Sequence, residues 1–468
     1  MFAKIQRVHF VGIGGIGMSG IAEVLLNLGY QVSGSDRKPS AVTARLAEMG
    51  AVICGEHRAE NVAGADVVII SSAIKLDNAE IIAAHQRHIP VIQRAEMLAE
   101  LMRLKYGIAV AGMHGKTTTT SMVAVVLAAG GLDPTVVVGG RVDAMGSNAR
   151  LGKSQYLVAE ADESDRSFLK LPPILAVVTN IDREHMDCYR NMEDVEQTFL
   201  QFMNSVPFYG MVVACNDNDD LRRLLAGVQR RTVTYGTRED SDFCISNMQC
   251  GPAGDSAALS SFQISYRGDD LGQFSLRVPG AHNVRNATAA IAVGVGLDVP
   301  VAEIRRALEN FNGVDRRFQL IGSANGVSVI DDYGHHPTEI RATLAAARQC
   351  GFKKVHVIFQ PHRYTRTQLL MDDFATAFRD ADSVLLLDIY AASEAPIAGI
   401  TGESLANHIT KSSGQEALYV PSFAEAVELA TSAAEAGDMV LTLGAGSISQ
   451  LAPQVLERLE RRTVKSVG

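Results

Sequence analysis

Two glycine-rich segments, each placed between a strand-like run and a helix-like run, have the composition of phosphate-binding loops. The first is Gly12-Ile13-Gly14-Gly15-Ile16-Gly17. Glycines let the backbone approach a diphosphate, whose charge would sit at the positive end of the following helix. Asp36, which follows about 20 residues later, could bind a ribose hydroxyl. Alone, this pattern fits an NAD-dependent dehydrogenase, a site for another nucleotide diphosphate, or a tight turn without a ligand.

The second segment, Gly112-Met113-His114-Gly115-Lys116-Thr117-Thr118, has the core of a nucleoside-triphosphate loop. Backbone N–H groups can hold phosphate oxygens, the Lys116 ammonium can approach the terminal phosphates, and the Thr117 hydroxyl can bind Mg²⁺. The spacer between the first glycine and Gly115-Lys116 is shorter than in the usual pattern. The competing interpretation is a lysine that caps an ordinary turn.

Acidic side chains follow the next two strand-like runs of this central region. Glu160 to Asp165 follow the run Tyr156–Ala159, and Asn180 to Asp187, with His185, lie at the end of the run Leu175–Asn180. The carboxyl ends of parallel strands open on one edge of a sheet, so these groups are expected beside the phosphate loop. They could hold Mg²⁺, although an imidazole ligand is unusual for that ion. Either segment alone fits a solvated loop.

Three further groups carry polar side chains at predicted element ends. Gly280–Ala287 opens a helix, and its Asn amides could bind an adenine edge or, with His282 or Asn283, cap the helix. Arginine pairs can clamp a carboxylate or a phosphate, but surface arginines are common. These last groups are Arg316-Arg317-Phe318, Asp331–Pro337 and His362-Arg363-Tyr364-Thr365-Arg366.

Strand-like and helix-like runs alternate along most of the chain, which predicts α/β parts with parallel sheets. The alternation restarts at Tyr106–Ala111 and again near Val327–Asp331. We therefore predict three domains, 1–106, 107–314 and 315–468. The short alternating runs of Ser241–Pro279 predict antiparallel strands added to the central domain.

The composition favours a cytoplasmic globular protein. The 468 residues have a net charge of −9, which disfavours broad binding to nucleic acid or anionic lipid. No apolar run has membrane-spanning length, and Met1–Phe10 lacks the apolar core of a signal peptide. The six cysteines are scattered, as in a protein with reduced thiols.

The motifs, in this order, resemble those of the Mur ligase family of peptidoglycan biosynthesis, and the resemblance spans essentially the whole chain. The first and the last two favour the alanine-adding branch of that family. The most specific motifs are Gly12–Gly20, Gly115–Thr118, Glu160–Asp165, His185-Met186-Asp187, Asp332–Pro337 and His362–Arg366.

The resemblance implies a Rossmann-like N-terminal domain for a UDP-sugar, a central P-loop-type α/β domain for ATP, and a Rossmann-like C-terminal domain. The implied reaction joins L-alanine to the carboxylate of UDP-N-acetylmuramate, with ATP and Mg²⁺ (or Mn²⁺) and an acyl-phosphate intermediate. It implies a monomer or weak homodimer with no nucleic-acid partner and no membrane insertion.

The family also implies roles for individual residues. The implied catalytic residues are Lys116, Glu160, His185, His335, Arg363 and Arg366, and the metal ligands are Thr117, Glu160 and His185. ATP would contact Gly112, Met113, His114, Gly115, Lys116, Thr117, Thr118, His282, Asn283, Asn286, Arg317 and Asp332. The UDP-sugar and the amino acid would contact Gly12, Gly14, Gly15, Gly17, Ser19, Asp36, Ser71, Tyr333, His335, Arg363 and Arg366.

The chain departs from several relatives in one respect. Those relatives bridge two metal ions with a carbamylated lysine shortly after the His-Met-Asp motif, but here no lysine occurs between Lys170 and Lys353. Glu160, His185 and water would then have to hold any second metal ion.

Three alternatives stay open on the sequence alone. A related ligase would add a peptide to the same UDP-sugar. An NAD-dependent dehydrogenase would fit the first glycine loop and Asp36 but would leave the last two motifs without a role. A nucleotide-gated binding protein would bind ATP and form no amide.

Overall fold

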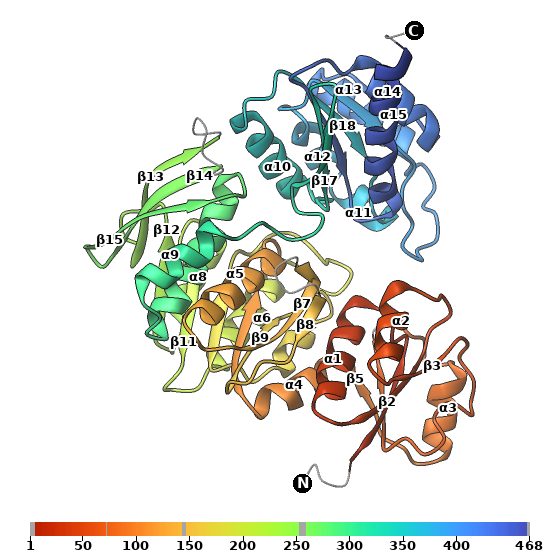
Figure 1. Ribbon diagram of the computed structural model, residues 1–468, viewed down its shortest axis with the longest axis vertical. Helices are drawn as coiled ribbons and strands as arrows, with labels where there is room; N and C mark the ends of the chain where they lie inside the picture. Colours follow the sequence, from red (N-terminus) through yellow and green to blue (C-terminus); the bar gives the residue numbers. More distant parts are fainter. Residues whose placement is uncertain (1–4, 72, 143–146, 252–258, 466–468) are drawn as a thin grey trace. The chain divides into compact units, whose positions relative to one another are not determined.

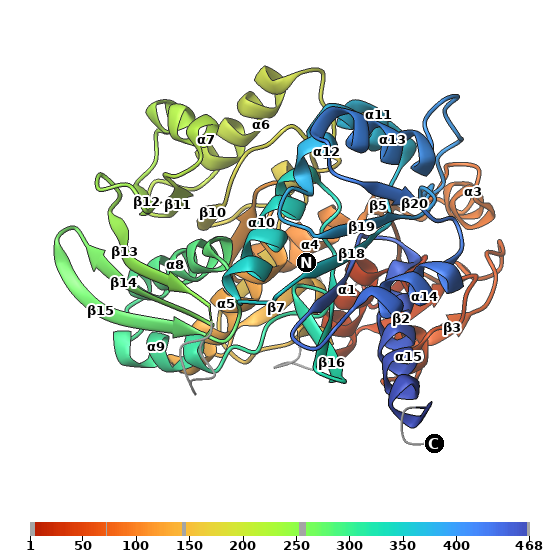
Figure 2. The ribbon, with the colours of Figure 1, turned by 90° about the horizontal axis from the view of Figure 1, so that it is seen from above.

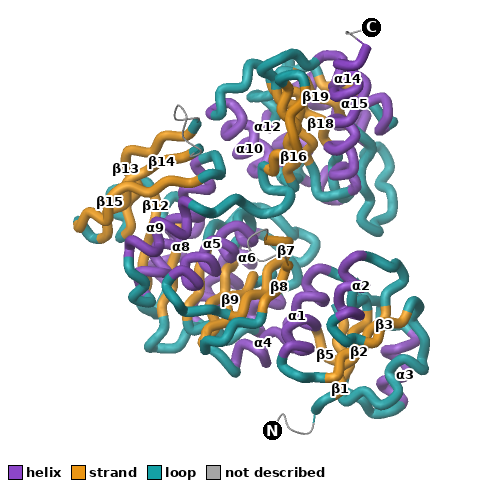
Figure 3. Tube along the Cα trace, viewed as in Figure 1, coloured by secondary structure: helices purple, strands orange, loops and turns teal. Residues whose placement is uncertain are grey.

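The structure is a computed structural model that describes residues 5–71, 73–142, 147–251 and 259–465 (Figure 1). The chain forms two compact units. The first comprises residues 1–246, 263–274 and 285–311, and the second comprises residues 247–262, 275–284 and 312–468. Three sheets carry the strands, and helices accompany each of them (Figure 3). The predicted α/β class with three sheets is confirmed.

The first sheet contains five parallel strands in the order β3-β2-β1-β4-β5. The order reverses direction beside β1, and this is the place where Rossmann-like sheets bind nucleotides. The chain passes from β1 through the glycine loop into α1 at this point. The elements are β1 Arg7–Val11, α1 Ile16–Asn27, β2 Gln31–Ser35, α2 Ala41–Glu48, β3 Val52–Cys54, β4 Val67–Ile70, α3 Ala79–Gln86 and β5 Val91–Gln93.

The second sheet contains ten strands in the order β15-β14-β13-β12-β11-β10-β6-β9-β7-β8. Its centre is parallel and apolar, and β6, β10 and β11 are buried along nearly their whole length. The strands are β6 Tyr106–Ala111, β7 Thr135–Val142, β8 Ser147–Arg150, β9 Tyr156–Glu160, β10 Leu175–Val178, β11 Met211–Cys215, β12 Thr232–Gly236, β13 Phe243–Cys250, β14 Ser260–Tyr266 and β15 Asp269–Leu276. The helices that accompany them are α4 Arg94–Arg103, α5 Lys116–Ala129, α6 Met192–Asn204, α7 Asp219–Leu224, α8 Ala281–Gly296 and α9 Val301–Glu309.

Three local features of this sheet differ from the sequence expectation. Helix α5 begins at Lys116, within the segment Gly112–Thr118 that was predicted as the phosphate loop, because Gly115 is left-handed (φ 81°) and turns the chain directly into the helix. Strands β7 and β8 pair in antiparallel fashion at one edge, which the sequence patterns did not predict. Strand β13, in the segment expected to be antiparallel, pairs with β12 in parallel through Phe243 and Cys244.

The third sheet has the order β16-β17-β21-β18-β19-β20 and is parallel except for the β16–β17 pair. Alternate side chains of its strands enter two apolar clusters, one with α10, α12 and α13 and one with α14 and α15, so helices cover both faces (Figure 2). The strands are β16 Gln319–Ala324, β17 Val327–Asp332, β18 Val355–Phe359, β19 Ser383–Leu386, β20 Ala417–Tyr419 and β21 Met439–Leu443. The helices are α10 Pro337–Gln349, α11 Tyr364–Leu369, α12 Met371–Ala377, α13 Gly402–Ser413, α14 Phe423–Ala433 and α15 Leu451–Lys465.

Within the described residues, no helix combines the length and the apolar character needed to cross a membrane.

Candidate active site

The first glycine loop is held in shape by the end of β2. The Gly12 and Ile13 amides donate to the Ser35 carbonyl (2.8 and 3.0 Å), and the Gly14 amide donates to Asp36 Oδ2 (2.9 Å). A Cβ on Gly14 would lie 2.7 Å from that same carboxylate oxygen, so the close approach requires glycine. Asp36 therefore shapes the loop, and its predicted contact with a ribose remains a prediction.

The phosphate loop joins β6 to α5, as its sequence predicted. Its bend is anchored by the end of β10, where Asn180 Oδ1 accepts the His114 amide (2.9 Å). The His114 carbonyl accepts from Asn180 Nδ2 (2.9 Å) and from Thr179 Oγ1 (2.7 Å). Gly112 has φ +131°, and a Cβ there would lie 2.1 Å from Thr179 Oγ1. The loop is thus packed tightly against the residues that follow β10.

Lys116 lies inside this loop and contacts a carboxylate that the site prediction missed. Its Nζ donates to the Gly112 and Met113 carbonyls (2.8 and 3.2 Å) and to Glu163 Oε1 (2.7 Å). Burial lowers the pKa of Lys116, but the charges of Glu163 and Glu160 more than offset this effect, so the pKa lies above its ordinary value. The charged form of Lys116 is therefore favoured at the place where terminal phosphates would bind.

The three residues expected to hold a metal ion lie at this same edge of the sheet. The Thr117 hydroxyl donates to both oxygens of Glu160 (3.0 and 3.2 Å). His185 Nε2 lies 3.3 Å from Glu163 Oε1, and His185 itself has a left-handed backbone (φ 56°). Glu163 is almost completely buried, and its Oε2 makes no hydrogen bond within the described part of the chain. Thr117 and Glu160 form an oxygen-rich pair of the kind that Mg²⁺ prefers, and His185 contacts Glu163.

Glu163 belongs to the acidic segment that the sequence singled out, but nothing distinguished it there from Asp162 or Asp165. The contact with Lys116 is the distinguishing feature, and it joins residues 47 positions apart. His114 also contacts a carboxylate from a distant segment, because its Nε2 lies 2.8 Å from Asp182 Oδ2. Of the other predicted loop residues, Met113 and Thr118 are buried.

A cavity of about 360 Å³ connects the first glycine loop with the end of β9. One wall carries glycines of that loop, another carries Glu160, which bonds Thr117 of the phosphate loop, and apolar side chains complete the lining. Ser71, a predicted substrate residue, lines the cavity. Ser19, another predicted substrate residue, is buried in α1. The lining residues are Gly12, Gly15, Gly17, Met18, Ser71, Arg94, Leu98, Val137, Val138, Glu160 and Asp162.

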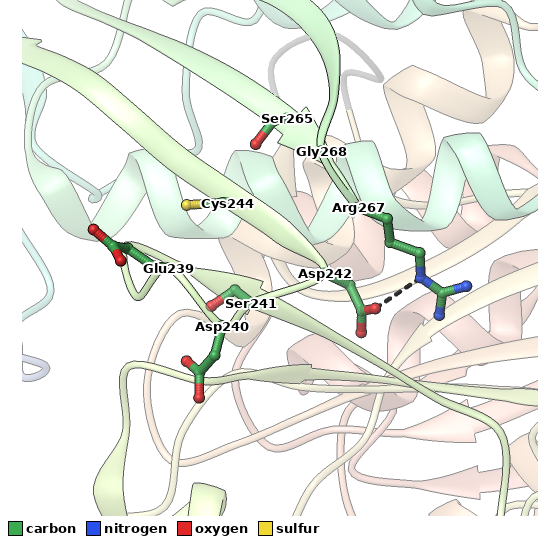
Figure 4. Close-up of a pocket in the computed structure, with 8 residues that line it drawn as sticks. All are labelled: Glu239, Asp240, Ser241, Asp242, Cys244, Ser265, Arg267 and Gly268. Atoms are coloured by element: carbon green, nitrogen blue, oxygen red, sulfur yellow. Dashed lines mark hydrogen bonds and ion pairs between the residues drawn. The ribbon is translucent and has the colours of Figure 1, made fainter.

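A second hollow, of about 370 Å³, lies by strands β13 and β14 and is shown in Figure 4. Its charged residues make structural contacts. Asp242 accepts from Arg267 Nε (2.8 Å) and from the Thr234 amide (2.9 Å), and Asp240 accepts from Asn216 Nδ2 (2.8 Å). The mainly acidic lining disfavours phosphate, so this hollow is a poor candidate for the nucleotide site.

The stretch predicted to bind adenine forms the start of α8. Asn283 Nδ2 donates to the Pro279 carbonyl (2.7 Å), so part of this amide stabilises the helix start. Asn286 lies against the phosphate loop, because a Cβ on Gly115 would be 2.7 Å from Asn286 Oδ1. His282 packs beside Gly280 in the same turn. The structure thus brings Asn286 to the loop, and the adenine contacts stay a prediction.

The C-terminal residues expected to bind substrate form a cluster of rings and guanidinium groups. The guanidinium carbons of Arg316 and Arg317 each lie 5.0 Å from the centroid of the Tyr333 ring, and the His335 ring packs edge-on against Tyr333 (5.4 Å). The His335 and His362 ring centroids are 5.7 Å apart.

The two arginines of the last motif lie at the start of α11. Arg366 Nη1 donates to the His362 carbonyl (3.2 Å). Arg363 has a left-handed backbone (φ 71°), and its Nη1 lies 3.9 Å from Glu394. The motifs therefore predicted the residues of this cluster, whereas no motif pointed to Glu394.

Both carboxylate oxygens of Asp332 accept hydrogen bonds from other groups of the protein. Oδ2 accepts from the Phe318 amide (2.7 Å), and Oδ1 accepts from the Gly334 amide (2.7 Å) and the Thr343 hydroxyl (3.3 Å). Burial raises the pKa of Asp332, and the charge of Arg317 offsets this only in part. In this structure Asp332 shapes the loop that presents Tyr333, and its predicted contact with the nucleotide remains a prediction.

Three sheets, with a phosphate loop and its carboxylates at the central one, indicate an enzyme that uses a nucleoside triphosphate. Comparisons with known proteins agree. The description "Mur ligase family, catalytic domain" matches residues 7–106, "Mur ligase middle domain" matches residues 110–294, and "Mur ligase, glutamate ligase domain" matches residues 316–446. The chain belongs to the Mur ligase family.

Individual relatives match over nearly their full length. A UDP-N-acetylmuramate–L-alanine ligase of Koribacter versatilis is 70% identical over 99% of both chains, and that of Acidobacterium capsulatum is 62% identical over 99% of both. The crystal structure of the UDP-N-acetylmuramate-alanine ligase of Thermotoga maritima has a TM-score of 0.81 at 31% identity, over 97% of this chain and 99% of that one. The family assignment does not favour the dehydrogenase alternative.

Proposed function

We propose that the protein joins L-alanine to the muramyl carboxylate of UDP-N-acetylmuramate, with cleavage of ATP to ADP and phosphate. The observation that carries this proposal is the cavity with the first glycine loop on one wall and Glu160 on another. A UDP-sugar whose diphosphate lies at that loop can extend its carboxylate toward the phosphate loop, because Glu160 hydrogen-bonds Thr117. The relatives at 70% and 62% identity carry the name of this activity.

The reaction activates a carboxylate before the amide forms. The muramyl carboxylate attacks the γ-phosphorus of ATP, and the bond between that phosphorus and the oxygen bridging it to ADP breaks. The products of this step are an acyl phosphate and ADP. The alanine amine attacks the acyl carbon, loses a proton, and expels phosphate. Lys116 stabilises the charge on the phosphoryl group during transfer, because its charged form is favoured and its ammonium is held within the loop.

Mg²⁺, when bound, would neutralise phosphate charge, and Mn²⁺ could replace it. The residues that would hold it are Thr117, Glu160 and His185, with Glu163 close to Lys116 and His185. Glu160 and Thr117 already contact each other, so little rearrangement of these side chains is needed.

The C-terminal cluster would orient the amino acid and the acyl group. Arg363 and Arg366 supply positive charge for the alanine carboxylate and the acyl phosphate. His185 or His335 would accept the proton that the amine loses. We also propose that the protein works in the cytoplasm, as a monomer or weak homodimer.

The experiment follows ADP release with each substrate omitted in turn. We expect release only with both UDP-N-acetylmuramate and L-alanine present, and equal release without either would overturn the proposal. Replacing alanine with a tripeptide tests the related peptide-adding activity. Lys116→Ala should abolish turnover and leave UDP-sugar binding intact, whereas the control Lys170→Ala, at an exposed pair with Glu96, should remain active.

A further inference from the structure

Arg94, a residue outside the glycine motifs, lies over the first glycine loop. It is the first residue of α4, immediately after β5. Its guanidinium lies beside Gly17, where a Cβ would be 2.9 Å from Nη1. Gly17 is in the first turn of α1, whose end carries amides without helical partners and a partial positive charge. A cation and a helix start therefore lie on the same part of the cavity wall.

Arg94 is paired with Asp162 in the same cavity. Nη2 donates to Asp162 Oδ2 (3.0 Å), and both residues line the cavity. The other oxygen of Asp162 has separate partners, the amide and hydroxyl of Ser164 (3.1 and 2.6 Å). Oδ2 is thus the oxygen that meets the guanidinium. This pair is part of the substrate cavity, and Arg94 is one-fifth exposed within it.

A guanidinium binds phosphate oxygens through the same paired hydrogen bonds that it makes to a carboxylate. A diphosphate at the first glycine loop would carry more negative charge than a single carboxylate, and it would also accept from the amides at the start of α1. The diphosphate can therefore compete with Asp162 for Arg94.

We propose that Arg94 binds the diphosphate of the UDP-sugar, and that Asp162 holds the guanidinium over the loop until the diphosphate replaces it. This inference rests on the proposed function. Asp162 follows Glu160 on the edge that carries the phosphate loop, so the exchange links occupation of the sugar site to the carboxylates beside the nucleotide site.

The exchange predicts opposite effects for the two residues. Arg94→Ala removes charge-assisted hydrogen bonds to phosphate and should weaken binding of UDP roughly 10- to 100-fold. Asp162→Asn removes the competing carboxylate and should tighten UDP binding about 2- to 5-fold. In the double variant the gain from Asp162→Asn should vanish, because it acts through Arg94.

The test is calorimetric titration of the full chain with UDP, in the absence of ATP, so that catalysis does not enter the measurement. Arg94→Lys keeps the charge without the planar fork and should bind UDP with intermediate affinity. Arg103→Ala is the matched control, because Arg103 lies on the same helix, exposed and paired with Glu100. In steady-state assays Arg94→Ala should raise the KM for the UDP-sugar and leave the KM for ATP unchanged.

The outcomes separate this inference from the proposed function. Wild-type protein that bound no UDP would overturn both. Wild-type protein that bound UDP while Arg94→Ala and Arg94→Lys bound it equally well would overturn only the role of Arg94. A gain from Asp162→Asn that persisted in the Arg94→Ala background would show that Asp162 acts by general repulsion, and the proposed exchange would be wrong. If Arg94→Ala failed to fold, the Arg94→Lys and Asp162→Asn affinities would decide.

Discussion

The Lys116 ammonium lies 2.7 Å from the Glu163 carboxylate, and this ion pair is almost fully withdrawn from water. The same carboxylate oxygen lies 3.3 Å from His185. One glutamate therefore connects the phosphate loop with the segment after β10. A nucleotide that approaches Lys116 meets a lysine whose position is already set by this partner.

Removal of the Glu163 charge should destabilise the protein and slow turnover. Glu163→Gln leaves a buried ammonium without its closest counter-ion, which costs about 3 kcal/mol of unfolding free energy. The exposed pair of Arg58 and Glu56 provides the control, since Glu56→Gln should cost less than about 1 kcal/mol. Urea denaturation measures both variants. Equal losses for the two would contradict a special role for the buried pair.

The space beside Gly115 should be essential for the nucleotide site. Gly115→Ala combines a left-handed backbone (φ 81°) with a Cβ 2.7 Å from Asn286 Oδ1, so the loop must move and the KM for ATP should rise about 10-fold or more. Gly131→Ala shares the left-handed backbone (φ +77°), but no atom lies within 4 Å of its Cβ. That control should lose about 1 kcal/mol of stability and keep its KM for ATP. A normal KM for Gly115→Ala would show that the contact with Asn286 is unimportant.

Glu80 should make the first sheet sensitive to acid. This buried carboxylate accepts from Ser35 Oγ and Asn61 Nδ2 (both 2.6 Å), and His9 Nε2 lies 3.4 Å away. Burial raises the pKa of Glu80, but contacts with His9, Ser35 and Asn61 lower it by a larger amount, so the net pKa lies below its ordinary value of 4.5.

The sign of the pH effect follows from this shift. Stability from the ionised Glu80 is fully present above pH 4.5 and is lost as the pH falls through the lowered pKa of the folded state. Glu80→Gln should therefore melt below the wild type at pH 7, and the difference should shrink toward pH 3. Glu60→Gln, at an exposed position, should follow the wild type throughout. A constant difference between Glu80→Gln and the wild type would contradict this assignment.

Ser393 has a backbone conformation that suits glycine. Ala392 (φ 47°) and Ser393 (φ 72°) are both left-handed, directly before Glu394, which accepts from the amide and hydroxyl of Thr365. Ser393→Gly should be more stable than Ser393→Ala by about 1 kcal/mol, because a residue with a Cβ is strained at this positive φ and glycine is not. At Ser432 in α14 the order should reverse, since glycine weakens a helix by about 1 kcal/mol relative to alanine. Calorimetric melting compares the four variants.

The sequence predicted the parts of the site that depend on local pattern. Both glycine loops, the strand ends and the three-sheet organisation follow from glycine spacing and from the alternation of apolar runs, because these features act over a few residues. Thr117 and Glu160 meet as expected, since both follow parallel strands of one sheet.

The missed residues depend on contacts between distant segments. Arg94 follows a short strand in no recognisable motif, and only the folded chain brings it to Asp162, 68 positions away. Asp36 matched the spacing of a ribose ligand, but spacing alone cannot show that its carboxylate accepts the Gly14 amide. The pairing of β7 with β8 was likewise missed, because an edge strand with few apolar residues has no strong period.

The hydrogen bonds that Asn180 and Thr179 make to His114 influence the affinity of the phosphate loop for a nucleotide. Both backbone groups of the residue at the bend are satisfied by other residues of the protein. A loop that had to be ordered by its ligand would subtract that loss of chain entropy from the binding free energy. Here the bend becomes ordered when the protein folds. The free energy that other amides of the loop gain by binding phosphate is therefore reduced little by the chain entropy of this bend.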